Sequence, residues 1–159
     1  MPKTHQQKTC MFLLQRTNSD NIHFRELVVL LDSFLANRDG KDHAFYAQFN
    51  KLDSIKNTVV CYDNDEPIGC GAFKQYDEST VEIKRMFVKP SHRAKGAATK
   101  ILQELEKWAI ENNYSSAILE TVKSQPEAVA LYKKNGYTIF PNFGQYKDVE
   151  NSICMHKIL

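Results

Sequence analysis

The chain has 159 residues, of which 42% are hydrophobic and 25% are charged, and its formal net charge is +2. This composition is typical of a globular protein, and no run of about 18 apolar residues predicts a membrane span. The polar N-terminal segment MPKTHQQKTC lacks the apolar stretch of a secretory signal. We therefore expect a single domain over residues 1–159 in a cytoplasmic protein.

The four cysteines are scattered along the chain without any C-x-x-C pair. They are Cys10, Cys61, Cys70 and Cys154. This spacing matches no common metal site, and a chain of this length does not need a disulfide framework. We expect reduced thiols and no metal, with Cys70 as a small core residue inside an apolar segment.

The N-terminal third predicts a strand followed by one or two helices. Thr9–Gln15 is apolar and strand-like, and the polar segment Thr17–Asn21 predicts a turn after it. Apolar residues then recur every three or four positions from Phe24 to Leu35, which predicts an amphipathic helix ending before Gly40. The aromatic residues at positions 45, 46 and 49 predict a second, shorter helix.

The middle of the chain predicts three successive antiparallel strands and a long helix. Asn57–Tyr62 and Pro67–Gln75 flank a turn-forming acidic segment and predict a hairpin, which Thr80–Val88 extends. A helix with one apolar face follows from Ala97 to Ala109. Ser116–Val122 is then expected to lie parallel to the strand before the helix, because a helical crossover connects the two.

The C-terminal part predicts one more helix and two strands. Ser124 is expected to cap this helix, with Glu127 completing a capping box and Asn135–Gly136 ending it. Tyr137–Phe140 and Ser152–Ile158 read as the late strands. The whole order predicts an α/β protein with a mixed sheet, mostly antiparallel, and helices on both of its faces.

The segment between the third strand and the long helix concentrates positive charge. Six Lys or Arg residues and no acid lie between positions 84 and 103, whereas the other 15 basic residues are outnumbered by 19 acidic ones. They are Lys84, Arg85, Lys89, Arg93, Lys95 and Lys100. A glycine-containing turn that leads into a helix N-terminus offers free backbone N–H groups, so we expect a phosphate-bearing ligand here.

Three segments form an ordered set of motifs along the chain. They are the strand Glu82–Val88, the turn Arg93-x-x-Gly96-x-Ala98 and the helix motif Gln125-x-x-Ala128-x-x-x-Tyr132-x-x-x-Gly136-Tyr137. Together they resemble the GNAT superfamily of acyl-CoA-dependent N-acetyltransferases. The resemblance implies a GNAT-like fold in which acetyl-CoA, the cosubstrate, lies where the two parallel strands splay apart. Two positions depart from the common pattern, since many members have Asn at position 125 and Gly at position 98.

The resemblance also implies which residues bind the cofactor. The backbone of Met86, Phe87 and Val88 would pair with the pantetheine arm. The backbone N–H groups of the turn would hold the pyrophosphate, and the turn consists of Arg93, Ala94, Lys95, Gly96, Ala97 and Ala98. Gln125 would stand in for the family's asparagine beside the cofactor. His92 is expected to contact phosphate or solvent rather than to act as a base.

Acetyl transfer to an amine requires an acid and a base. Tyr132 matches the family's general-acid tyrosine, although tyrosine at helical spacing also suits a purely structural core position. Glu82, an acid between apolar residues, and Glu120, on the partner strand, are the candidate bases. Glu82 could instead form an ion pair with Lys84 or Arg85.

The amine substrate is not identified by these motifs. Tyr46, Tyr76, Tyr146 and Asp148 are candidates to contact it, and the late strands with the Phe143–Tyr146 loop are candidates for a homodimer contact. A non-catalytic CoA-binding or sensor module with the same fold is the alternative function. Nucleic-acid binding is disfavoured because the basic segment contains only one aromatic residue suited to stacking, Phe87.

Overall fold

The computed structural model describes residues 12–39 and 55–159, which form a seven-stranded sheet with helices on both faces. The strands occur in the spatial order β1-β2-β3-β4-β5-β7-β6. Their bounds are β1 Leu13–Thr17, β2 Asn57–Asp63, β3 Glu66–Gln75, β4 Thr80–Val88, β5 Ser116–Val122, β6 Thr138–Phe140 and β7 Ser152–Ile158. The expected α/β fold with a mixed sheet is confirmed.

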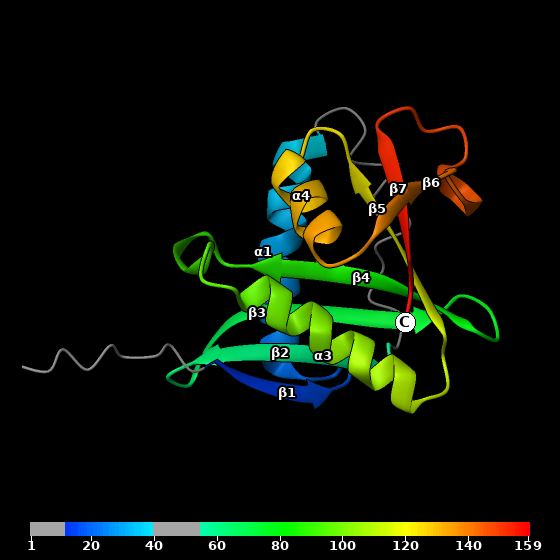
Figure 1. The fold of residues 1–159 in the computed structure, drawn as a ribbon. Coiled ribbons are helices and arrows are strands. Elements are labelled where there is room, and N and C mark those ends of the chain that lie inside the picture. The colour runs from blue at the N-terminus through cyan, green and yellow to red at the C-terminus, as the bar shows by residue number, and fades with distance from the viewer. Residues whose placement is uncertain (1–11, 40–54) are drawn as a thin grey trace, which may run out of the picture.

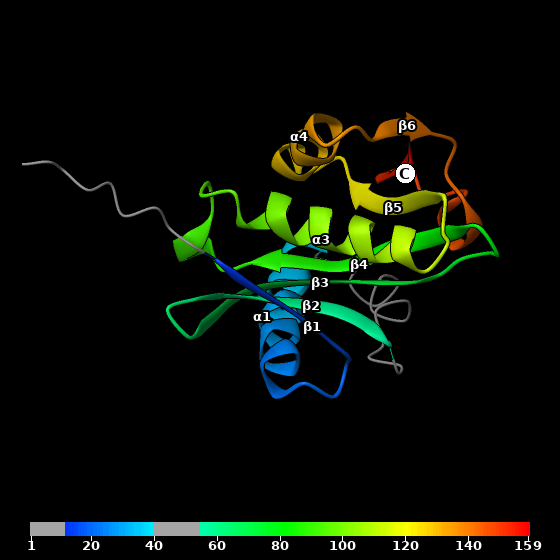
Figure 2. The ribbon, with the colours of Figure 1, turned by 60° about the horizontal axis from the view of Figure 1, so that its bottom comes forward.

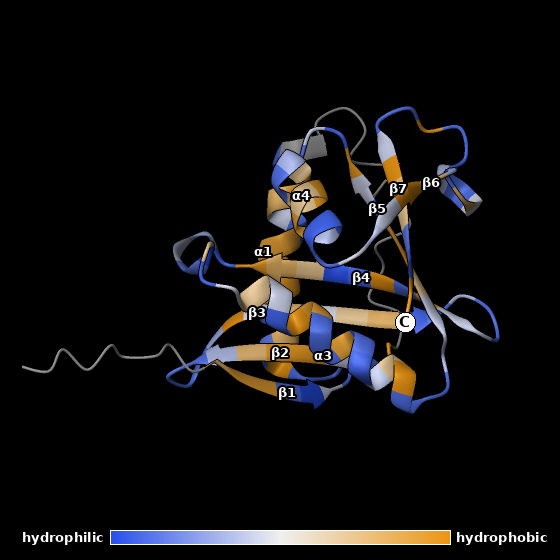
Figure 3. Cartoon of the chain, viewed as in Figure 1, coloured by the Kyte–Doolittle hydropathy of each residue, from blue (hydrophilic) through white to orange (hydrophobic). Residues whose placement is uncertain are grey.

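Helices α1 (Ile22–Asp39) and α3 (Ala97–Glu111) cover opposite faces of the β1–β4 half of the sheet (Figures 1 and 2). The hydropathy colouring shows the apolar stripe of α3 among its polar positions (Figure 3). Its buried side chains, such as Ile101 and Leu105, pack on the sheet with Val59 and Val81. Phe24 and Leu27 of α1 pack on the other face. No described helix has both the length and the apolar character that a membrane crossing requires.

Strands β1 to β4 pair antiparallel in sequence order, as the hairpin pattern predicted. Asn64 and Asp65 form the β2–β3 turn, and both have positive φ angles, of 48° and 67°. Such left-handed pairs match the right-handed twist of the flanking strands, and Asn and Asp tolerate this conformation better than most residues.

Strands β4 and β5 are the parallel pair, and they separate after a short stretch of pairing. Only Thr80, Val81 and Glu82 of β4 pair with β5, opposite Ser116, Ala117 and Ile118. Beyond Glu82, the last residues of β4 continue along β3, while β5 pairs with β7 on its other side. The predicted splay between two parallel strands is therefore present, and it opens toward the N-terminus of α3.

A bulge interrupts β4 just after the two strands separate. Lys84 pairs with Ala72 and Phe87 pairs with Cys70, so two residues of β4 lie between these pairs where β3 has only one. Arg85 is the residue with a positive φ, of 60°, and its carbonyl accepts a hydrogen bond from the Cys70 thiol at 3.4 Å. The extra residue places both Lys84 and Arg85 on the α1 face, because it breaks the alternation of side chains along the strand.

Several expected boundaries at the N-terminal side were wrong. The first strand was expected over Thr9–Gln15, but β1 begins at Leu13 and continues to Thr17, and positions 9–11 lie outside the described residues. Helix α1 begins at Ile22 because the Asn21 side chain accepts a hydrogen bond from the Phe24 amide at 3.0 Å. Gly40, the expected second helix and Tyr46 also lie outside the described residues.

Helix α4 comprises Pro126–Lys134, so it begins one residue later than a helix capped by Ser124 would. The cap position is Gln125, not Ser124, and no side chain forms a capping hydrogen bond, so the expected capping box was wrong. Pro126 occupies the first turn, where its missing N–H costs no hydrogen bond. The end of the helix matches the prediction, since Asn135 is its C-cap and Gly136 follows with a φ of 93°.

Candidate active site

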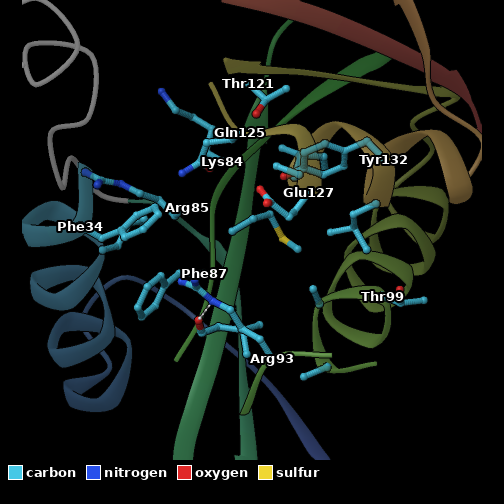
Figure 4. A pocket seen from close by; sticks show the side chains of 18 of the residues that line it. Phe34, Lys84, Arg85, Phe87, Arg93, Thr99, Thr121, Gln125, Glu127 and Tyr132 are labelled. Atoms are coloured by element: carbon cyan, nitrogen blue, oxygen red, sulfur yellow. Dashed lines mark hydrogen bonds between the residues drawn. The ribbon is translucent and has the colours of Figure 1, made fainter. Parts of the chain in front are cut away.

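A cavity of about 590 Å³ opens where β4 and β5 separate. Its walls come from both faces of the sheet. Leu31, Phe34 and Leu35 of α1 line one half, and Ala98, Leu131 and Tyr132 of α3 and α4 line the other. Figure 4 shows the two groups on opposite sides of the strand, with Phe34 and Arg85 beside α1 and Tyr132 on α4. A volume of this size suits a ligand larger than a single ion.

The turn before α3 lines this cavity and leads into a helix N-terminus, whose first backbone N–H groups have no partner within the helix. Ala94 and Gly96 have positive φ angles of 63° and 86°, and Gly96 is the N-cap of α3. No side chain caps the helix, and its first turn contains no acidic residue. A Cβ atom on Gly96 would meet nothing within 4 Å, so the space before the helix N-terminus is open. The turn therefore has the conformation and the partial positive charge of an anion site.

Side chains hold this turn in place from two directions. Arg93 Nε donates a hydrogen bond to the Val88 carbonyl at 2.9 Å, and its guanidinium lies 5.2 Å from the ring centre of Phe34 and 5.9 Å from that of Phe87. His92 Nε2 lies 3.5 Å from a carboxylate oxygen of Asp63 in the β2–β3 hairpin. Arg93 thus fixes the backbone while its charge stacks on aromatic rings.

Tyr132 is the buried tyrosine of α4 at the cavity wall. Its side chain packs against the ring of Tyr137 with a centre-to-centre distance of 5.8 Å. Burial raises the pKa of the Tyr132 hydroxyl, and the negative charge of Glu120 raises it further. The hydroxyl makes no hydrogen bond with the described residues. Tyr132 therefore keeps its proton at neutral pH, and its hydroxyl can donate a hydrogen bond to a ligand.

Glu82 and Glu120 contribute two carboxylates to the α1 half of the cavity. Glu82 is 4% exposed and lies at the last paired position of β4. Glu120 accepts a hydrogen bond from the Ser152 hydroxyl at 3.0 Å. Burial raises the pKa of the Tyr146 hydroxyl. Tyr146 also lies close enough to both carboxylates that their negative charges raise this pKa further. The cavity thus holds carboxylates able to accept a proton, directly or through water.

Two cations lie beside these carboxylates on β4. Lys84 is half-buried, and burial lowers the pKa of its ammonium while Glu82 opposes the shift. Arg85 Nη1 donates to Asp32 Oδ1 of α1 at 2.9 Å, and the Arg85 side chain is only 2% exposed. An ion pair of Glu82 with Lys84 or Arg85 was the alternative to a role as base, and Arg85 pairs with Asp32 instead.

The structure brings nearly all of the sequence-predicted site residues to one cavity. The lining includes Glu82, Met86, Phe87, Val88, Arg93, Ala94, Gly96, Ala97, Ala98, Glu120, Gln125 and Tyr132. Lys95 is exposed and does not line the cavity. Of the substrate candidates, Tyr146 lines the cavity, whereas Tyr76 is 48% exposed and packs against Phe143 outside it.

The sequence indicated that α1 contributes to the substrate side of the cavity, but not which of its residues contact the cations of the site. Asp32 pairs with Arg85, and the Phe34 ring packs against the guanidinium of Arg93. A signal for the bulge was present. Glu82, Ile83 and Lys84 alternate in polarity as a strand should, and the second consecutive cation, Arg85, breaks this alternation.

A family comparison agrees with this geometry. The model of the acetyltransferase (GNAT) family matches residues 24–137, from α1 to the residue before β6. The chain belongs to the GNAT family. A Bacillus subtilis (strain 168) relative, named as the uncharacterized N-acetyltransferase YsnE, is 36% identical over 100 residues. The match covers 62% of this chain and 66% of YsnE, just under two thirds of that protein's length.

Solved GNAT structures share the fold over nearly the whole chain. A Klebsiella pneumoniae protein, provisionally named an acyl-CoA N-acyltransferase, superposes with a TM-score of 0.78 and 26% identity over 94% of this chain and 99% of its own. A GNAT family acetyltransferase from Elizabethkingia anophelis, solved with acetyl-CoA bound, gives a TM-score of 0.68 at 20% identity, covering 93% of this chain and 98% of its own.

Proposed function

We propose that the protein transfers an acetyl group from acetyl-CoA to a primary amine within a complex of both substrates. The observation that carries this proposal is the cavity between β4 and β5, which is lined both by the glycine-containing turn before α3 and by the buried Tyr132. Membership of the GNAT family and the acetyl-CoA bound in the Elizabethkingia anophelis relative support the choice of donor.

The residues of the α3 side fit acetyl-CoA. The N–H groups of the turn from Arg93 to Ala98 would hold the pyrophosphate, and the open space before Gly96 lets a phosphate approach the backbone. The backbone of Met86 to Val88 and the side chain of Gln125 would contact the pantetheine arm. When bound, acetyl-CoA supplies an acetyl group activated as a thioester.

The residues of the cavity supply the two proton transfers. An alkylammonium has a pKa of roughly 10.4, so the amine must lose a proton before its nitrogen can attack the carbonyl carbon. Glu82 or Glu120 would accept that proton, directly or through water. As the bond between carbon and sulfur breaks, Tyr132 would donate its phenolic proton to the departing sulfur.

The role of Tyr132 is tested by replacing it with phenylalanine. Tyr132→Phe keeps the ring that packs against Tyr137, so the fold and the affinity for acetyl-CoA should remain within about twofold, whereas kcat should fall about 100-fold or more. The measurements are thiol release across a panel of primary amines and calorimetric titration with acetyl-CoA.

The thiol-release assay on Glu82→Gln and Glu120→Gln decides between the two candidate bases. The variant that lacks the base should lose the acidic limb of the profile of kcat/KM against pH, because that limb reports protonation of the base.

The alternative function, a non-catalytic CoA-binding module, predicts a different result. Such a protein would bind acetyl-CoA tightly and release no thiol with any amine in the panel, and Tyr132→Phe would change nothing. Failure of the wild-type protein to bind acetyl-CoA would contradict both functions.

We also propose that the protein works in the cytoplasm. Cys61, Cys70 and Cys154 are all free and buried, which suits a reducing compartment.

A further inference from the structure

Arg85 is a buried cation whose hydrogen bonds are incompletely satisfied. Its Nη1 is paired with Asp32, but its Nη2 is buried and has no hydrogen-bond partner among the described residues. A guanidinium offers its donors in a planar fork that matches the two oxygens of a carboxylate. A buried charged donor without an acceptor is unfavourable, and none of the described residues supplies one, so a ligand in the cavity that Arg85 lines is a candidate acceptor.

The backbone of Arg85 is also held in an unfavourable conformation. Its φ of 60° lies in the left-handed region, which costs energy for a residue with a side chain. Such positions persist where the surrounding structure holds them, and they concentrate at functional sites. Here the result of the bulge is that two consecutive cations, Lys84 and Arg85, face α1 and line the cavity.

The α1 half of the cavity therefore presents charges of both signs. Glu82 and Glu120 suit an ammonium group, whereas Lys84 and Arg85 suit an anion. A simple alkylamine would use only the carboxylates and would supply no acceptor for Arg85 Nη2. Glu82 and Arg85 are three positions apart on β4, which is at most about 10 Å along a strand, so a small extended molecule can reach both side chains.

We propose that the amine substrate carries a carboxylate, and that Arg85 binds this carboxylate while the amine faces Glu82 and Glu120. The substrate class is thus an amino acid or another short amino carboxylate. This inference rests on the proposed acetyl transfer, because it assigns the second substrate of the same cavity. The apolar side chains of Leu31, Phe34 and Leu35 would contact the remainder of that molecule.

A purely structural role for Arg85 is the competing explanation. The ion pair with Asp32 joins β4 to α1, and this contact alone could justify a buried arginine. It involves only Nη1, however, and leaves Nη2 unexplained. Asp32→Asn provides the matched control, since it weakens the contact to α1 but keeps the guanidinium.

The test compares amino carboxylates with the same molecules lacking the negative charge. The protein amino acids, β-alanine and γ-aminobutyrate are each assayed beside their carboxamides, with acetyl-CoA at saturation. We expect the wild-type protein to favour the preferred carboxylate over its carboxamide by at least about tenfold in kcat/KM. Arg85→Gln should reduce this ratio to near one, Arg85→Lys should give an intermediate ratio, and Asp32→Asn should retain the preference.

A binding measurement separates this inference from the proposed function. The same probes are titrated into the protein loaded with CoA, with thermal unfolding as a check that each variant is folded. If no amine is acetylated but carboxylates bind in an Arg85-dependent manner, the acetyl transfer fails and the carboxylate site stands. If amines are acetylated with equal efficiency with and without a carboxylate, or if folded Arg85→Gln keeps the wild-type ratio, the carboxylate site is overturned. If nothing binds or reacts, both proposals are wrong.

Discussion

Gly96 shows how a single residue sets the donor side of the cavity. It caps α3 with a φ of 86°, and no atom lies within 4 Å of the position where a Cβ would be. Glycine at this position therefore permits the left-handed backbone conformation and leaves space for a ligand, and it is not required by close packing. Gly144 has a φ of 52° and the same open surroundings, but it lies in the 3₁₀ turn Gly144–Tyr146, away from the anion-binding turn.

These two glycines form a matched pair for a prediction. Gly96→Ala and Gly144→Ala should each lower the free energy of unfolding by about 1–2 kcal/mol, because each forces alanine into the left-handed region. Only Gly96→Ala should also weaken acetyl-CoA binding, by about tenfold, or roughly 1.4 kcal/mol. Urea unfolding and calorimetric titration measure the two effects. Equal loss of acetyl-CoA affinity in both variants would show that the effect comes from stability and not from the turn.

At the scale of elements, the close contact between α3 and β3 places the helix N-terminus at the cavity. Gly71 of β3 makes this contact possible. A Cβ there would lie 2.6 Å from Met86 Sδ and 2.8 Å from Ile101 Cγ2. The helix consequently lies against the strand at the same level as the bulge in β4.

Gly71→Ala should therefore destabilise the fold by overpacking. We expect a loss of about 1–3 kcal/mol in the free energy of unfolding, measured by chemical denaturation. The added methyl group meets Met86 most closely, so the loss should be smaller when Gly71→Ala is made in a Met86→Ala background. Additive effects of the two changes would indicate that the helix moves as a whole and that Met86 does not set the contact.

The elements differ in how well their sequences predict them. Strands β4, β5 and β7 have the expected bounds, because turn-forming residues flank each apolar run. Helix α4 begins differently, since Ser124 has the residue type of a cap but its side chain does not make the bond. The bulge at Arg85 has only a weak local signal, the second consecutive cation, because the register between β3 and β4 is a long-range property.

The half of the cavity lined by α3 and α4 was predictable from the sequence, and the half lined by α1 was much less so. The turn around Gly96 and the helix with Tyr132 are local motifs with fixed spacing, so the sequence alone indicates them. Arg85 and Asp32 are 53 positions apart and meet only when α1 packs on the sheet. Tertiary contacts of this kind depend on the packing of the whole fold, so the sequence alone does not predict the ion pair between Arg85 and Asp32.

At the scale of the whole molecule, each described core cluster contains one buried thiol. Cys61 lies in the cluster under α3, Cys70 in the cluster under α1 and Cys154 in the cluster near Tyr146. Burial raises the pKa of Cys61 from 9.0 to about 11, that of Cys70 to about 12 and that of Cys154 to about 11. Alkaline pH should therefore destabilise all three clusters, because each contains a thiol whose pKa is raised by burial.

The pH dependence of stability follows from these thiols. Below pH 9 they are protonated in both the folded and the unfolded protein, so their contribution is constant. Above pH 9 the unfolded chain releases the protons while the folded protein retains them, and the free energy of unfolding should fall. Each thiol should remove about 1.4 kcal/mol between pH 8 and pH 10.

Urea unfolding of the wild-type protein and of Cys61→Ala and Cys154→Ala at both pH values measures this slope. Each substitution creates a small cavity that lowers stability equally at the two pH values, so the difference between pH 8 and pH 10 isolates the ionisation. That difference should shrink by about 1.4 kcal/mol in each variant. A variant with the wild-type difference would show that its thiol ionises as readily in the folded core as in the unfolded chain.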